Sequence, residues 1–194
     1  MTYSCRGCLD KMDSSKSILL FFKDLRQACK RKGWILKMDY EMVTLEEKIA
    51  VGVSARTNNT APDMGAVIGG LWNRFYKEGI YASIPKKTNA KALGIYTDYA
   101  GDEKADYTAF VACEAAEVPA GDAFAVCHIP AGRYAKFVVH GNMVQAVAEA
   151  WQAIWQMDLP RAFQCDFEEY QNDDMGNDAE IHIYVGLKEN GQEG

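Results

Sequence analysis

Two neighbouring glutamates are the residues best suited to chemistry, because aromatic side chains flank them in the stretch Phe167-Glu168-Glu169-Tyr170. On a strand, Glu168 and Tyr170 share one face, while Phe167 and Glu169 share the other. If the Phe167 face packs on helices, Glu168 and Tyr170 point into a groove, where a bound cation would offset the cost of burying a carboxylate. The alternative is a solvated acidic edge formed with Asp166, and a reversed register would place Glu169 in the groove instead.

Aromatic residues elsewhere in the chain could surround such a carboxylate and attract a cation, by roughly 0.5–2 kcal/mol for each ring. Each of them is equally typical of a hydrophobic core, so pocket and core remain open for every ring. The predicted ligand-binding residues are Glu168, Tyr170, Trp72, Tyr96, Tyr107, Phe110, Tyr134 and Trp151.

The other reactive residues, Cys and His, are not accompanied by the further residues that a metal site or a catalytic site needs. Cys5-Arg6-Gly7-Cys8 is a single C-x-x-C pair, whereas a zinc site would need four ligands. His128, His140 and His182 are not part of a recognisable nucleophile motif, and the glycines do not form a phosphate-binding loop. The sequence therefore predicts no metal, no cofactor and no catalytic triad.

Two amphipathic helices would position these residues. One is predicted from Met64 to about Lys77 with Asp63 as its cap, and the other from Met143 to about Gln156 with Asn142 as its cap. The two apolar faces superpose without a gap, and each begins with Met and has Trp at the fifth apolar position. Extended segments are predicted around each helix, over 40–56, 92–99, 107–115, 124–139, 164–170 and 180–188.

The repeated order predicts an α+β fold of two tandem β-α-β-β units, related by a pseudo-twofold axis. Antiparallel sheets would form a central ligand groove, with the helices on one side of the sheets and the groove on the opposite side. An extra basic helix is predicted within 14–32. The predicted organisation is an N-terminal extension over 1–38, one domain over 39–188 and a flexible tail over 189–194.

Six short motifs give the chain a resemblance to the GyrI-like domain, also called the AraC-type effector-binding domain. The motifs are Gly70-Leu71-Trp72-Asn73-Arg74-Phe75, Leu93-Gly94-Ile95-Tyr96, Ile129-Pro130-Ala131-Gly132-Arg133-Tyr134-Ala135-Lys136-Phe137, Ala148-Glu149-Ala150-Trp151, Phe167-Glu168-Glu169-Tyr170 and Glu180-Ile181-His182-Ile183-Tyr184. The resemblance covers residues 39–188. It implies the same fold of two β-α-β-β units and a pocket for lipophilic, frequently cationic, small molecules.

The resemblance also implies a role for Glu168, the glutamate that neutralises a bound cation in many members of the family. Some members stand alone and bind drugs or DNA gyrase, and a subset hydrolyses reactive cyclopropane compounds. Regulators of the family carry a DNA-binding helix-turn-helix, which needs two helices, but only one is predicted before residue 39. We therefore expect a stand-alone binding protein, with an enzyme that uses Glu168 or a protein-interaction module as alternatives.

Charge and hydropathy narrow the set of partners. The net charge is −6, and the acidic residues are concentrated after residue 37, which disfavours binding to a phosphate backbone. No apolar run approaches the ~18 residues of a membrane span. We expect a cytoplasmic protein with reduced, buried Cys113, Cys127 and Cys165 and no direct contact with nucleic acid or membrane. A protein partner could bind through the N-terminal helix, or the domain could bind gyrase.

Overall fold

The computed structural model describes residues 38–171 and 178–189. The predicted helix within 14–32 and the pair Cys5 and Cys8 lie outside these residues, so nothing tests them. The predicted domain boundaries stay a prediction as well.

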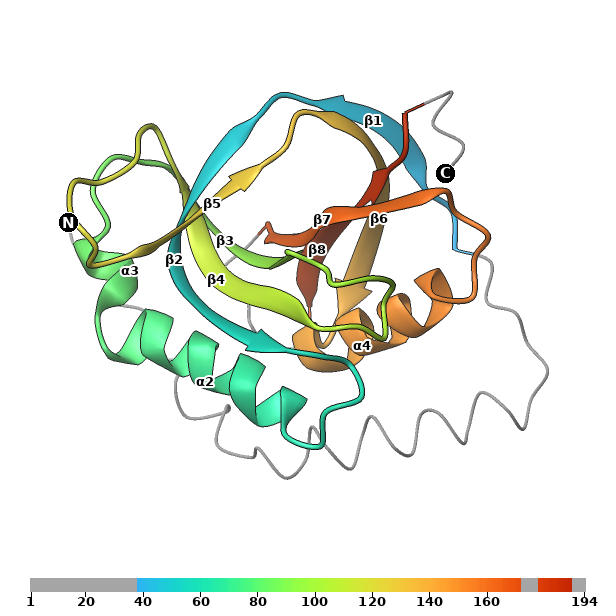
Figure 1. The fold of residues 1–194 in the computed structure, drawn as a ribbon, viewed down its shortest axis with the longest axis horizontal. Helices are drawn as coiled ribbons and strands as arrows, with labels where there is room; N and C mark the ends of the chain where they lie inside the picture. The colour runs from blue at the N-terminus through green and yellow to red at the C-terminus, as the bar shows by residue number, and fades with distance from the viewer. Residues whose placement is uncertain (1–37, 172–177, 190–194) are drawn as a thin grey trace.

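Eight antiparallel strands form a single curled sheet, with three helices in the described part of the chain (Figure 1). The strands follow one another across the sheet in the order β1-β6-β8-β7-β3-β4-β2-β5. Their bounds are β1 Glu41–Leu45, β2 Lys48–Thr57, β3 Lys87–Thr97, β4 Tyr107–Ala115, β5 Ala125–Ile129, β6 Gly132–Gly141, β7 Arg161–Tyr170 and β8 Ala179–Leu187. The predicted α+β class and antiparallel sheet are confirmed.

The same order of elements occurs twice along the chain. In each half two strands precede a helix and two strands follow it, and the first half adds the short helix α3, Ile80–Ser83. The innermost strands of the two halves, β3 and β7, pair at the centre of the sheet. The first strand of each half pairs with a strand of the other half, because β1 pairs with β6 and β5 pairs with β2. Each half therefore supplies the outermost strand of the other.

The two long helices lie where the sequence predicts them. Helix α2 covers Met64–Lys77, and helix α4 covers Met143–Ile154. Asn142 caps α4, since its side chain accepts a hydrogen bond from the backbone nitrogen of Gln145 at 3.2 Å. The side chain of Asp63 makes no such bond, so the predicted cap of α2 is wrong in this detail.

The sheet has an apolar core on each face. Helices α2 and α4 cover one face, where Leu71, Phe75 and Trp151 pack with Ile181 and Ile183 of β8. Figure 1 shows both helices on this side of the sheet. The sheet curls around its other face, where the second core includes Ile95, Phe167 and Tyr184, with the rings of Phe167 and Tyr184 stacked at 4.5 Å.

Candidate functional site

A cavity of about 140 Å³ opens between the two long helices, above the central strands of the sheet. Its helical walls are Met64, Gly65, Ile68, Gly69 and Trp72 of α2, and Met143, Val144, Val147, Ala148, Trp151 and Trp155 near α4. Its floor is formed by Tyr96, Tyr107, Glu168 and Tyr170. The predicted position of the groove is therefore wrong in one respect, because the cavity lies on the helix side of the sheet.

Glu168 lies on the floor of this cavity and is almost completely buried, with 2% of its surface exposed. Tyr96 and Trp151 donate hydrogen bonds to its Oε1, from the hydroxyl at 2.8 Å and from Nε1 at 2.7 Å. Tyr170 donates a hydrogen bond to Oε2 at 2.6 Å. Burial raises the pKa of Glu168 above its ordinary value of 4.5, although the three hydrogen bonds act in the opposite direction.

None of the three donors to Glu168 carries a charge. Burial, followed by the charge of Glu168, raises the pKa of both Tyr96 and Tyr170, so both hydroxyls keep their protons. Among the described Lys, Arg and His residues, none forms an ion pair with Glu168. Arg161 also lines the cavity, but its guanidinium pairs with the buried carboxylate of Asp166 at 2.7 Å. The floor of the cavity thus holds a carboxylate without a cation.

The floor follows the symmetry of the two halves. The pairing of β3 with β4 is irregular up to Ala92, and the pairing of β7 with β8 is irregular up to Asp166. Two residues further along, Gly94 and Glu168 occupy equivalent positions and are paired directly with each other. After two more residues come Tyr96 and Tyr170, which bind the two oxygens of the carboxylate.

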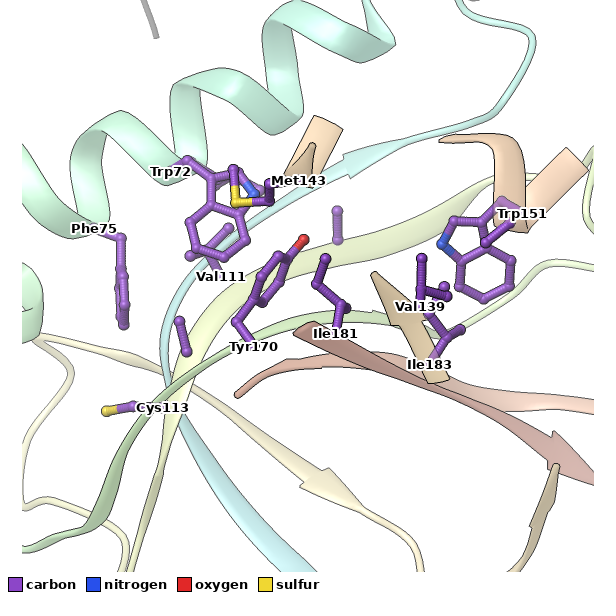
Figure 2. Close-up of a cluster of buried hydrophobic side chains, with 14 of the residues drawn as sticks. Trp72, Phe75, Val111, Cys113, Val139, Met143, Trp151, Tyr170, Ile181 and Ile183 are labelled. Carbon is purple, nitrogen blue, oxygen red and sulfur yellow. The ribbon is translucent and has the colours of Figure 1, made fainter. Parts of the chain in front are cut away.

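The two equivalent tryptophans follow the same symmetry. Trp151 lies edge-on against Tyr96, with the ring centroids 5.7 Å apart, and Trp72 lies edge-on against Tyr170 at 5.1 Å. Figure 2 shows Trp72 and Trp151 on either side of the cluster, with the hydroxyl of Tyr170 between them. Each helix thus places its Trp against the Tyr of the other half.

Gly94 creates the space that Glu168 occupies. A Cβ atom at Gly94 would lie 2.9 Å from Oε2 of Glu168 and 3.6 Å from its Cδ. A side chain at this position would force the carboxylate to move.

Six of the eight residues predicted for the site line the cavity, namely Trp72, Tyr96, Tyr107, Trp151, Glu168 and Tyr170. Phe110 and Tyr134 do not line it, because both point to the other face of the sheet and pack in the second core. The hydroxyl of Tyr134 donates to the carbonyl oxygen of Pro130 at 2.8 Å. We therefore leave these two residues out of the proposed site.

Glu169 also points away from the cavity, so it cannot replace Glu168 there. Its carboxylate accepts a hydrogen bond from Lys91 at 2.9 Å, and Lys48 lies 3.8 Å away. Burial would raise the pKa of Glu169, but Gln171, Lys91 and Lys48 outweigh burial and lower it.

Several residues of the cavity were not predicted as site residues. Gly65 and Gly69 of α2 face the space between the helices, opposite Val144 and Ala148 of α4. The superposition of the two helix faces could have found them, because each lies one position beyond an apolar residue that the halves share. Tyr99 was also missed, and its hydroxyl donates to Asp166 at 2.8 Å.

Within 38–171 and 178–189, no group of three or more His, Cys, Asp or Glu side chains could hold a metal ion. No helix of that part is long and apolar enough to span a membrane. Cys113, Cys127 and Cys165 are buried free thiols, as predicted.

The comparison with family models identifies one family. The family model Cass2, described as integron-associated effector binding protein, matches residues 41–187 and confirms the predicted resemblance to effector-binding domains. The integron cassette protein VCH_CASS2, from the mobile metagenome of Vibrio cholerae, has a similar structure with 26% identity and a TM-score of 0.60. That match covers 75% of this chain and 95% of the other.

A second solved structure shares the fold. It is SAV2435 bound to tetraphenylphosphonium, with 22% identity and a TM-score of 0.65, and the match covers 78% of this chain and 94% of the other. A search of the curated proteins found no match.

Proposed function

Because the chain belongs to the family of integron-associated effector-binding proteins, we propose that it binds a lipophilic cation between α2 and α4, with Glu168 as the counter-ion. The observation that carries this proposal is the buried carboxylate of Glu168, which has three neutral hydrogen-bond donors and no ion-pair partner among the described residues. Hydrogen bonds from neutral groups orient a carboxylate but leave its charge uncompensated. A ligand cation would supply the missing charge.

The walls of the cavity suit the rest of such a ligand. Trp72, Tyr96 and Trp151 expose aromatic surface to the cavity, and a cation near these rings gains cation–π attraction as well as Coulomb attraction to Glu168. The bound tetraphenylphosphonium in SAV2435, which shares the fold, is a lipophilic cation and supports the proposal.

The size of the cavity limits how a ligand enters. Its volume of about 140 Å³ is close to that of cavities that accept one benzene-sized ring. A ligand with several rings would place one ring against the floor and leave the others at the mouth, or would spread the two helices.

The proposal predicts a specific loss of affinity when the charge is removed. Tetraphenylphosphonium binding, measured by isothermal titration calorimetry, should be at least about tenfold weaker in Glu168→Gln, which corresponds to about 1.4 kcal/mol. The matched control is Glu169→Gln, which removes the neighbouring charge on the other face of the sheet and should leave the affinity unchanged. Equal affinities of the wild type and Glu168→Gln would refute the role of Glu168, provided that thermal unfolding shows both to be folded.

A further inference from the structure

Trp72 and Trp151 occupy equivalent positions but use their indole nitrogens differently. Trp151 Nε1 donates a hydrogen bond to Glu168 Oε1 at 2.7 Å, whereas Trp72 Nε1 donates to none of the residues that the structure describes. Both side chains are equally buried, at 7% exposure.

The Trp72 ring packs against the same cluster as Trp151 but contacts a different tyrosine. The ring stands edge-on against Tyr170, with an angle of 82° between the planes, and Tyr170 is the residue that bonds to Oε2. A Cβ atom at Gly94 would lie 3.8 Å from Cζ2 of Trp72, so the Trp72 ring lies close to the strand that carries Gly94. Both oxygens of Glu168 accept from other donors, Oε1 from Tyr96 and Trp151 and Oε2 from Tyr170.

The nitrogen of Trp72 is not sealed inside the protein. The described side-chain atoms that are fully buried without a hydrogen-bond partner are Gln152 Nε2 and Arg161 Nε, and Trp72 Nε1 is not among them. Since Trp72 lines the cavity and its nitrogen is not fully buried, we infer that a group inside the cavity can reach this nitrogen. An indole N–H only donates hydrogen bonds, so the group that satisfies it must be an acceptor.

We propose that Trp72 Nε1 is the second polar contact of the ligand and donates a hydrogen bond to a neutral acceptor that the ligand carries beside its cationic group. A carbonyl, ether or ring-nitrogen atom would fit this description. A second anion is excluded, because Glu168 already places a negative charge on the floor. This inference rests on the proposed function and narrows it, since a cation without an acceptor leaves the N–H without a partner in the occupied site.

Matched probe ligands test the inference. One series is benzyltriphenylphosphonium with an acetyl group at the ortho, meta or para position, and each member is compared with the isopropenyl analogue of nearly equal shape. In the wild type, at least one acetyl isomer should bind about three- to tenfold more tightly than its isopropenyl match. In Trp72→Phe, which keeps an aromatic ring but removes the donor, this preference should disappear while the isopropenyl compounds still bind.

A second readout observes ligand binding in the wild-type protein itself. In ¹⁵N-labelled wild-type protein, the indole N–H resonance of Trp72 should shift downfield with the preferred acetyl isomer and not with its isopropenyl match. The resonance is assigned by its loss in Trp72→Phe.

The outcomes separate this inference from the function on which it rests. If the cations bind and Glu168→Gln weakens them, but no acetyl isomer is preferred, the inference is wrong and the proposed function stands. A preference that persists in Trp72→Phe also overturns the inference. If none of the cations binds to the wild type, both proposals fail.

Discussion

The carboxylate of Glu168 is costly to the free protein, because burial raises its pKa and thus favours the neutral form. A group with a raised pKa in the folded state stabilises the fold below its ordinary pKa, and this contribution is lost as the pH rises through the raised value. Above the raised pKa, the free protein therefore holds a charge that the unfolded chain would hold at lower cost. Glu168, which would bind the cation, therefore also lowers the stability of the protein when no ligand is bound.

Glu168→Gln should consequently stabilise the free protein at neutral pH. The amide keeps the shape of the carboxyl group and can still accept from Tyr96 and Trp151. We expect a higher Tm in Glu168→Gln at pH 7, with about 2–4 °C for each kcal/mol gained, and a difference that shrinks toward pH 4.5. Thermal unfolding across this pH range measures it, and a variant that is less stable at every pH would contradict the prediction.

Gly94 holds Glu168 in place by having no side chain. In Gly94→Ala the new Cβ would lie 2.9 Å from Oε2 and would push the carboxylate away from the hydroxyl of Tyr170. Because hydrogen bonds to charged groups contribute roughly 1.5–3 kcal/mol, tetraphenylphosphonium should bind about tenfold more weakly. The double variant Gly94→Ala/Glu168→Gln should lose little more than Glu168→Gln alone, whereas fully additive losses would show that Gly94 acts independently of the carboxylate.

At the scale of the elements, α2 shapes the cavity through a residue that leaves space. A Cβ atom at Gly69 would meet nothing within 4 Å, and the same holds for Gly70, but only Gly69 lines the cavity. Replacing each of the two glycines therefore distinguishes the effect on helix stability from the effect on the volume of the cavity.

Gly69→Leu and Gly70→Leu should both stabilise the protein, by up to about 1 kcal/mol each, because glycine is a poor helix former. Only Gly69→Leu should fill the cavity and weaken tetraphenylphosphonium binding, by at least about tenfold. Calorimetric titration and thermal unfolding of both variants measure this, and equal affinities would show that the ligand does not occupy the space beside Gly69.

Helices α2 and α4 and strand β4 could be predicted well from the sequence, because the helices have strong periodicity and β4 begins and ends where its pattern does. The extended segment predicted over 40–56 instead forms two strands, β1 and β2. The sequence could not predict which side of the sheet carries the cavity. Strand parity places Glu168 and Tyr170 on one face and Phe167 on the other, but it does not say which face the helices cover. Phe167 suggested the helix face, yet the curl of the sheet gives Phe167 a second apolar core.

The same curl explains why two of the predicted residues lie elsewhere. Phe110 and Tyr134 are aromatic and buried, as pocket residues would be, but they fill the inside of the curl. Composition cannot distinguish two apolar faces of one sheet. The short helix α3 was not predicted because four residues carry no periodicity.

At the scale of the whole molecule, the site exists only because the two halves meet. Gly94 and Tyr96 come from the first half, and Glu168 and Tyr170 come from the second. Gly94 and Glu168 occupy equivalent positions in the two halves, so the centre of the site contains one carboxylate and not two. A symmetrical pair of glutamates would place two negative charges side by side and raise the cost of burial.

The exchange of the leading strands also governs how the chain can acquire its structure. β1 precedes the other strands in the sequence, but it can pair only after β6 has been synthesised. The outer edge of β2 stays unpaired until β5 has been synthesised. On the ribosome, the first half thus emerges with an unpaired edge at β2 and a strand that has no sheet to join. Pairings between segments so distant in sequence form slowly, so we infer that productive folding begins only after most of the second half has left the exit tunnel.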